Sequence, residues 1–329
     1  MLRSNLVRAA LRGAFASVLV LGLVTPARAL PPECPTYFPD FRCGRHGRYE
    51  GFVPPMMHPY LFEDPFITTG LSVWGIWHEF PGDSILDGGH LWDVAVQARL
   101  AVTDRIALVA SKDGWVKFEP SLGLLEDAQG MTDIAFGVKA AVVDLPEVPF
   151  ILTPGLRFEL TNGSRDVLQG NGDGIFIPSI SAAWGFDRFH VIGDIGMQVP
   201  IDTDKNSTSL FYHLHLDYAV LPFLVPFIEV GGFYYTDGGD GSTEIKLAGG
   251  GDVPLGVAQA LLGEDPEEGY DYANLGSRGI AGHSVVAGSV GVRVPITKHF
   301  IFGMAYEYPL SPSRDVLKQR ATANLTIEF

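Results

Sequence analysis

The chain has 329 residues, of which 47% are apolar and 19% charged, with two cysteines and a formal net charge of −15. This acidity argues against nucleic acid or an anionic membrane surface as a partner. After the N-terminal region, the longest apolar stretch is residues 219–228, which Pro222 and Pro226 interrupt. No membrane-spanning helix is therefore predicted there.

Residues 1–29 have the features of a cleaved signal peptide. Three arginines precede an apolar core near residues 14–24, and Ala27-Arg28-Ala29 provides the small residues of a cleavage site. The core is shorter than the roughly 20 residues that a membrane-spanning helix needs. Cleavage removes four arginines and no acidic residue, so the mature chain from Leu30 carries a net charge of −19.

Residues 30–68 are rich in proline and lack periodicity, which predicts a short irregular periplasmic segment. Cys34 and Cys43 are the two cysteines of the chain, and the oxidising periplasm predicts a disulfide between them. A metal site with His46 and His58 is the alternative, which the lack of a second cysteine pair disfavours. The sequence leaves two places for this segment, inside a barrel or beneath it.

Residues 69–329 contain twelve segments in which apolar and polar residues alternate, each close to the length of a tilted membrane strand. The last of them ends on Phe329, so the chain has no polar tail. Because alternation has a period of two, each segment presents an apolar and a polar face. The segments are 69–80, 90–102, 105–112, 131–143, 149–161, 175–186, 188–199, 209–220, 223–235, 280–294, 299–309 and 320–329.

The connections between these segments alternate between short and long. Residues 103–104, 186–188 and 296–298 are short connections, whereas 162–174 and 236–279 are long. Short turns on one side and long loops on the other are typical of outer-membrane barrels, in which the short turns are periplasmic. The sequence therefore predicts an all-β fold, an up-and-down antiparallel transmembrane β-barrel of about twelve strands, with both ends in the periplasm.

This architecture predicts the surroundings of the protein. We expect the outer membrane of a Gram-negative-type bacterium, where membrane lipid and lipopolysaccharide contact the barrel. The C-terminal Phe329 is the expected signal for the barrel assembly machinery. A small-molecule solute is the remaining predicted partner, and no nucleic acid is expected.

Strand parity predicts which residues line the lumen. A charged group facing lipid at mid-depth costs a few kcal/mol, so the polar face of each strand should point inward. These side chains either form a paired network that fills the lumen or line a narrow aqueous passage, and the strand number favours the passage. The predicted lining residues are Asp93, Gln97, Arg99, Asp133, Lys139, Arg157, Glu159, His190, Asp194, His213, His215, Asp217, Glu229, His283, Arg293 and Glu307.

Two features suggest metal ions. His213, His215 and Asp217 share one strand face at spacings of about 6.6 Å, which suits zinc if a neighbouring strand adds a ligand. The acidic loop 236–279 could hold calcium, although Asp237-Gly238-Gly239-Asp240-Gly241 lacks the full spacing of a calcium loop. No other cofactor is predicted. Residues 253–262 of this loop are expected to form a short helix over the mouth, where the loop would gate.

Two stretches resemble known outer-membrane barrels. Tyr49-Glu50-Gly51-Phe52-Val53-Pro54-Pro55 and residues 61–66 look like the lead-in of a group of uncharacterised barrels. Residues 153–160, followed by Gln169-Gly170-Asn171-Gly172 and Gly174, resemble the phenol-degradation meta-pathway family of proposed outer-membrane transporters. The resemblance implies a channel for small molecules, aromatic ones among them, and implies no catalytic residue.

An enzyme is the contrasting class. A barrel phospholipase needs serine and histidine together on the lipid face, yet the chain has no His-x-Ser, and His283 and Ser284 point to opposite faces. An omptin-like protease needs an Asp-His pair, and no histidine follows an aspartate. We therefore predict a channel or transporter for small solutes and no enzymatic activity. The alternative is a non-conducting structural or adhesion barrel.

Overall fold

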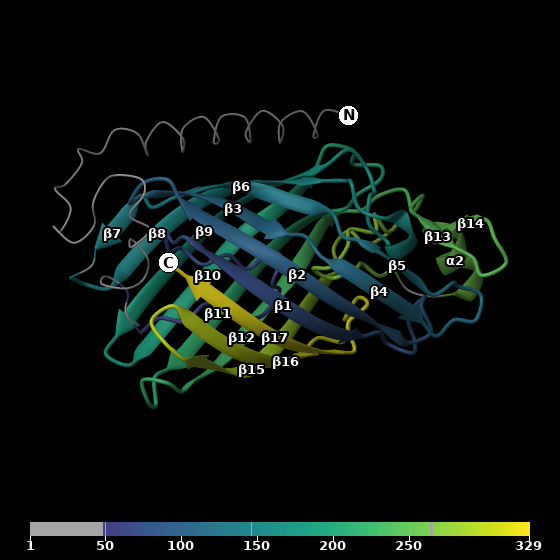
Figure 1. The fold of residues 1–329 in the computed structure, drawn as a ribbon. Helices are drawn as coiled ribbons and strands as arrows, with labels where there is room; N and C mark the ends of the chain where they lie inside the picture. The colour runs from purple at the N-terminus through teal and green to yellow at the C-terminus, as the bar shows by residue number, and fades with distance from the viewer. Residues whose placement is uncertain (1–48, 50, 146, 264–265) are drawn as a thin grey trace. The chain divides into compact units, whose positions relative to one another are not determined.

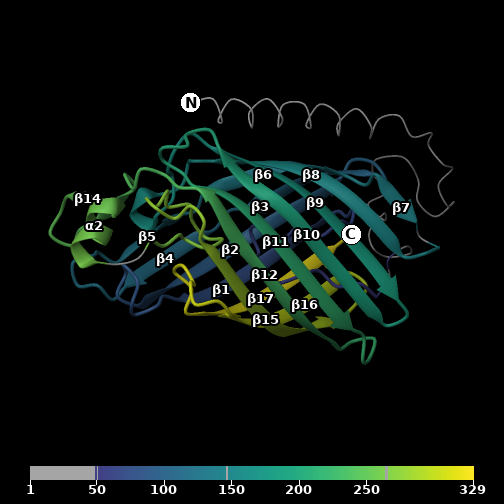
Figure 2. The same cartoon turned by 180° about the vertical axis from the view of Figure 1, so that it is seen from behind.

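The computed structural model describes residues 49, 51–145, 147–263 and 266–329. Within them, twelve antiparallel strands form a closed β-barrel, since β1 pairs with both β2 and β17 (Figures 1 and 2). The predicted fold class is confirmed, and each predicted segment overlaps one wall strand. These strands are β1 (Gly70–Glu79), β2 (Gly89–Ala101), β3 (Ile106–Lys112), β6 (Ile134–Ala140), β8 (Phe150–Leu160), β9 (Ile175–Phe186), β10 (Phe189–Pro200), β11 (Thr208–Tyr218), β12 (Val225–Asp237), β15 (Ser284–Pro295), β16 (Phe300–Pro309) and β17 (Gln319–Glu328).

Further short elements extend the wall or lie in the connections. β4 (Trp115–Pro120) and β5 (Ala128–Met131) continue β3 and β6 where sequence analysis assigned a long loop. That region was missed because its polarity is inverted: Val116 and Phe118 face inward, whereas Lys117 is exposed. The others are β7 (Val143–Leu145), η1 (Arg165–Val167), β13 (Glu244–Lys246), β14 (Asp252–Pro254) and α2 (Leu255–Leu262), the last of which confirms the predicted helix.

The barrel has a short-turn end and a long-loop end. β1 starts and β17 finishes at the short-turn end, where Gly70 is the register partner of Glu328. The connections β2–β3, β9–β10 and β15–β16 lie at the same end, and the connection from β12 to β15 lies at the other. Both ends of the barrel wall therefore lie at the short-turn end, which in outer-membrane barrels faces the periplasm.

The wall is apolar outside and polar inside. On β11, the outward Tyr212 and Leu214 are exposed, whereas His213, His215 and Asp217 are buried. A soluble protein has the opposite arrangement, since it buries apolar side chains and exposes charged ones. The barrel is therefore built for lipid, with its polar groups in the lumen. Among the helices of the described residues, none has both the length and the apolar character to span a bilayer.

Candidate functional site in the barrel lumen

Residues 52–68 lie inside the barrel and are buried throughout; we call them the lumen segment. The chain enters at the short-turn end, where the Tyr49 hydroxyl donates to Asp144 at 2.5 Å. It turns at His58, whose carbonyl accepts hydrogen bonds from the Leu61 and Phe62 amides, and returns to β1. The sequence predicted a periplasmic segment over residues 30–68 that lies either inside the barrel or beneath it, and the part of this region that the structure describes lies inside.

The remainder of the N-terminal predictions cannot be compared with the structure. The signal peptide, Cys34 and Cys43 all lie outside the described residues. The disulfide between the two cysteines therefore stays a prediction.

The barrel wall leaves room for the lumen segment at two glycines. A Cβ on Gly185 would lie 2.7 Å from the Phe52 ring, and one on Gly303 would lie 2.6 Å from the Met56 sulfur. Either distance is shorter than van der Waals contact allows, so a larger residue would displace the segment. The wall and the segment are thus shaped to each other, which indicates a specific complex rather than a loosely enclosed loop.

One side of the lumen is basic. The inward side chains Arg99, Lys112, Lys139 and Arg157 come from the four successive wall strands β2, β3, β6 and β8. Arg99 and Lys139 form ion pairs of 2.7 Å with Glu63 of the lumen segment. Arg157 donates to the carbonyls of Tyr60 and Leu61 at 3.0 and 2.7 Å. We call Arg99, Lys139 and Arg157 the basic cluster.

The opposite side, on β10, β11 and β12, carries acids and histidines, and these three strands contain no lysine or arginine. Glu229 accepts hydrogen bonds from the Met56 and Met57 amides, each at 2.8 Å. Asp194 accepts one from the Glu63 amide at 3.3 Å.

Each buried acid on these strands also has a histidine partner. Asp194 lies 2.5 Å from His213, Asp217 lies 2.7 Å from His190, and Glu229 lies 2.7 Å from His215. The lumen segment therefore contacts two walls of opposite charge.

Other inward groups hold the backbone of the segment. Gln97 donates to the Pro59 carbonyl at 2.6 Å, and Arg293 donates to those of Pro54 and Pro55 at 2.9 and 2.8 Å. The proline-rich segment has no regular structure to satisfy its carbonyls, so the wall supplies the donors instead.

Residues 266–283 close the lumen from the long-loop end; we call them the inner loop. Asp271 accepts from Arg320 of β17 at 2.5 Å, and the Tyr272 hydroxyl donates to the Val167 carbonyl at 2.6 Å. The Tyr270 ring meets the turn of the lumen segment, with its centroid 4.5 Å from that of His58. The lumen is thus filled from both ends.

The structure places most of the predicted lining residues inside the barrel. Apart from Arg99, which is partly exposed, those on wall strands are buried, and Asp133 is buried just before β6. His283 differs, because β15 begins at Ser284 and leaves His283 half-buried in the connection before the strand.

Sequence reasoning missed several lumen groups. Arg320 and Asn324 share the polar face of β17, so the alternation that marked this strand could have found them. Lys112 follows a register shift between β3 and β6 that reverses strand parity, and parity alone could not find it. Glu63 and Asp64 lie in a region without periodicity, so no alternation of polar and apolar residues indicated that they face the lumen.

The predicted metal ligands are bound to other side chains. His213 lies 2.5 Å from both Asp194 and His58, and His215 lies between Glu229 and Asp217. Among the described residues, no group of three histidine, cysteine, aspartate or glutamate side chains is arranged to hold a metal ion. Binding of zinc or calcium stays a prediction.

A buried acid in the loops gives a prediction for the effect of pH. Burial raises the pKa of Asp315 to about 8; the hydrogen bond from Tyr235 opposes this rise, and the nearby Glu268 carboxylate adds to it. Since the unfolded side chain ionises near pH ~4, the folded protein holds an extra proton between about pH 4 and pH 8. Stability should therefore fall as the pH rises through this range.

The substitution Asp315→Asn should remove that dependence. We expect its Tm to exceed that of the wild type by an amount that grows from pH 5 to pH 8, measured by thermal unfolding in detergent. Asp127→Asn, at an exposed position, is the control. A constant difference across the range would contradict the prediction.

Solved structures of outer-membrane proteins have folds similar to this barrel. The COG4313 outer membrane channel from Pseudomonas putida F1 matches with a TM-score of 0.52 and 15% identity, covering 84% of this chain and 100% of that one. The chain has the fold of an outer-membrane β-barrel. NanC porin matches with a TM-score of 0.47 and 8% identity, covering 79% of this chain and 98% of that one. Outer membrane phospholipase A from Escherichia coli matches with a TM-score of 0.37 and 10% identity, covering 79% of this chain and 92% of that one.

These identities establish the fold alone. No protein-family model matches the sequence. No curated protein matches it either.

Proposed function

We propose that this protein is an outer-membrane channel for small solutes and that the lumen segment is its gate. The observation that carries the proposal is what fills the lumen. Many inward polar side chains of the wall bind a separate stretch of chain, instead of packing only against one another. A barrel that needed only a filled interior could supply it from its own strands.

The segment can leave without opening the sheet. The barrel closes through the pairing of β1 with β17, which uses none of residues 52–68. The polar contacts of the segment are hydrogen bonds and ion pairs, which water can replace once it enters. His58, at the turn, has a φ of 45°, a left-handed conformation that costs a non-glycine residue about 1–2 kcal/mol. This strain is released when the turn unfolds.

The non-conducting barrel is the second candidate, and the closed lumen favours it. One small cavity, of about 10 Å³, lies between the segment and the basic side of the wall. An enzymatic role has less support, because the sequence contains no His-x-Ser, the spacing that places these two side chains on one face of a strand. The channel proposal has three further parts. The barrel assembly machinery inserts the protein, lipopolysaccharide of a Gram-negative cell contacts it, and the solutes it passes include aromatic ones.

The substitution Glu229→Gln tests the gate. The glutamine has one acceptor oxygen for the two amides of Met56 and Met57, so one charge-assisted hydrogen bond worth about 1.5–3 kcal/mol is lost. The open fraction should rise about tenfold to a hundredfold. We would measure it as open probability in planar lipid bilayers, beside wild type and the exposed control Glu147→Gln. Silence of the folded Glu229→Gln protein at all voltages would favour the non-conducting barrel.

A further inference from the structure

We propose that the basic cluster, Arg99, Lys139 and Arg157, is a binding subsite for small carboxylates, which Glu63 and Asp64 occupy while the channel is closed. This proposal rests on the function proposed above and names the solute class. The lumen segment then acts as a built-in mimic of the solute.

The contacts of Glu63 define the subsite. Arg99 donates through Nε and Nη2 to the two oxygens of this carboxylate, at 2.8 and 2.7 Å. Lys139 donates through Nζ to one of the same oxygens at 2.7 Å and to Asp64 at 3.2 Å. A paired guanidinium contact with a lysine beside it is a geometry that selects carboxylates over neutral groups.

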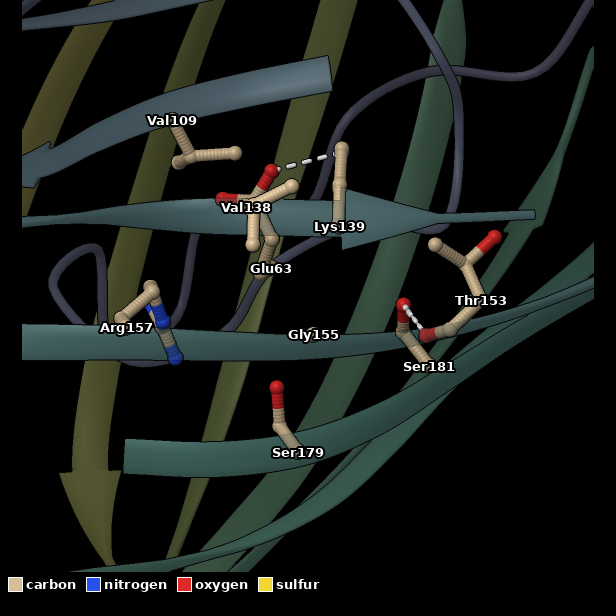
Figure 3. Close-up of a pocket in the computed structure, with 9 residues that line it drawn as sticks. All are labelled: Glu63, Val109, Val138, Lys139, Thr153, Gly155, Arg157, Ser179 and Ser181. Atoms are coloured by element: carbon tan, nitrogen blue, oxygen red, sulfur yellow. Dashed lines mark hydrogen bonds and ion pairs between the residues drawn. The ribbon is translucent and has the colours of Figure 1, made fainter. Parts of the chain in front are cut away.

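A cavity continues the subsite beyond the carboxylate. Figure 3 shows Glu63, Lys139 and Arg157 among the residues that line it, together with Thr153, Ser179 and Ser181. Its volume of about 10 Å³ holds roughly one water molecule, so it is too small for a solute while Glu63 is present. Arg157 Nε is buried and has no hydrogen-bond partner among the described residues. The cavity therefore offers an unused donor next to the ion pair.

The exit of the lumen segment would remove the ion-pair partners of two wall cations, and the wall acid Asp93 would lose the hydrogen bond that Tyr60 donates. Arg99 and Lys139 have their ion-pair partners in that segment, whereas Lys112 keeps Glu159 of the wall. On the opposite side, Asp194, Asp217 and Glu229 keep His213, His190 and His215. The open lumen would thus contain unpaired positive charge in the basic cluster, which attracts a carboxylate and repels a diamine.

Glu63→Ala provides the test, because it removes a fragment close in size to acetate. We expect this variant to unfold at a lower Tm in detergent and acetate to restore most of the loss. Acetamide, which is neutral and of similar shape, and methylammonium should restore none of it at equal ionic strength. By calorimetry, acetate should bind about tenfold or more tightly than acetamide. In Glu63→Ala/Arg99→Gln the acetate effect should disappear.

Equal rescue by acetamide, or no acetate binding to the folded Glu63→Ala protein, would overturn the proposal. If that variant does not fold, Asp64→Ala with the same three probes replaces it, and acetate must still exceed acetamide. The binding measurement does not need an open pore. Acetate binding by a barrel that never conducts would refute the channel and keep the subsite, whereas conduction without acetate binding would refute the subsite alone.

Discussion

Deletion of residues 30–66 should convert a closed barrel into a stable open pore. In the described structure, the lumen segment occupies the space between the basic side and the acid-histidine side of the wall. Without it, water reaches Arg99, Lys139 and Arg157, so these charges become solvated instead of buried and unpaired. The sheet remains closed through β1 and β17, and the barrel should therefore stay folded.

Planar-bilayer recordings measure this effect directly. The full mature chain should stay at the closed baseline with brief openings, and the deletion variant should show long-lived conductance. Deletion of residues 30–48 is the matched control, because it keeps the lumen segment and should remain closed. A heat-modifiable, folded deletion variant that never conducts would show that the inner loop alone closes the barrel, and the lumen segment would lose its role as gate.

The substitution Lys112→Met should cause the largest loss of stability among the single changes considered. Lys112 and Glu159 form an ion pair of 2.6 Å, and both side chains are 4% exposed. Removing the cation strands a buried carboxylate, and breaking a buried pair in this way costs about 3–5 kcal/mol. Equilibrium unfolding in urea, with the barrel in lipid vesicles, would measure the change in the free energy of unfolding.

A double substitution separates the pair from its surroundings. Lys112→Met/Glu159→Met removes both charges and replaces them with apolar groups of similar length, so most of the lost stability should return. If the double variant is as unstable as the sum of the two single ones, the charges do not act as a pair. In that case the loss of stability would come from packing around Tyr60, whose ring centroid lies 5.8 Å from the Lys112 Nζ atom.

The strands of the wall could be predicted from the amino-acid sequence. A strand between lipid and lumen must alternate, since its side chains point to opposite faces, and each residue reports its own environment. The alternation of residues 320–329 is thus enough to predict β17, and the parity of β11 is enough to place His213, His215 and Asp217 inside. Strand parity did not predict the inward position of Lys112, because a register shift precedes this residue. It also did not predict β4, in which the apolar side chains face inward and the polar ones outward.

Only the tertiary structure decided what fills the lumen. Residues 52–68 have no periodic pattern, because they form neither helix nor strand, and their carbonyls and amides are satisfied by partners distant in the chain. Glu63 forms an ion pair with Lys139. The Met56 amide donates a hydrogen bond to Glu229, which lies 173 residues further along the chain. Such pairings depend on the closure of the whole barrel, which brings both walls to one segment. Local sequence therefore specifies the wall and its two faces, whereas long-range packing specifies where the lumen segment lies and which wall residues it contacts.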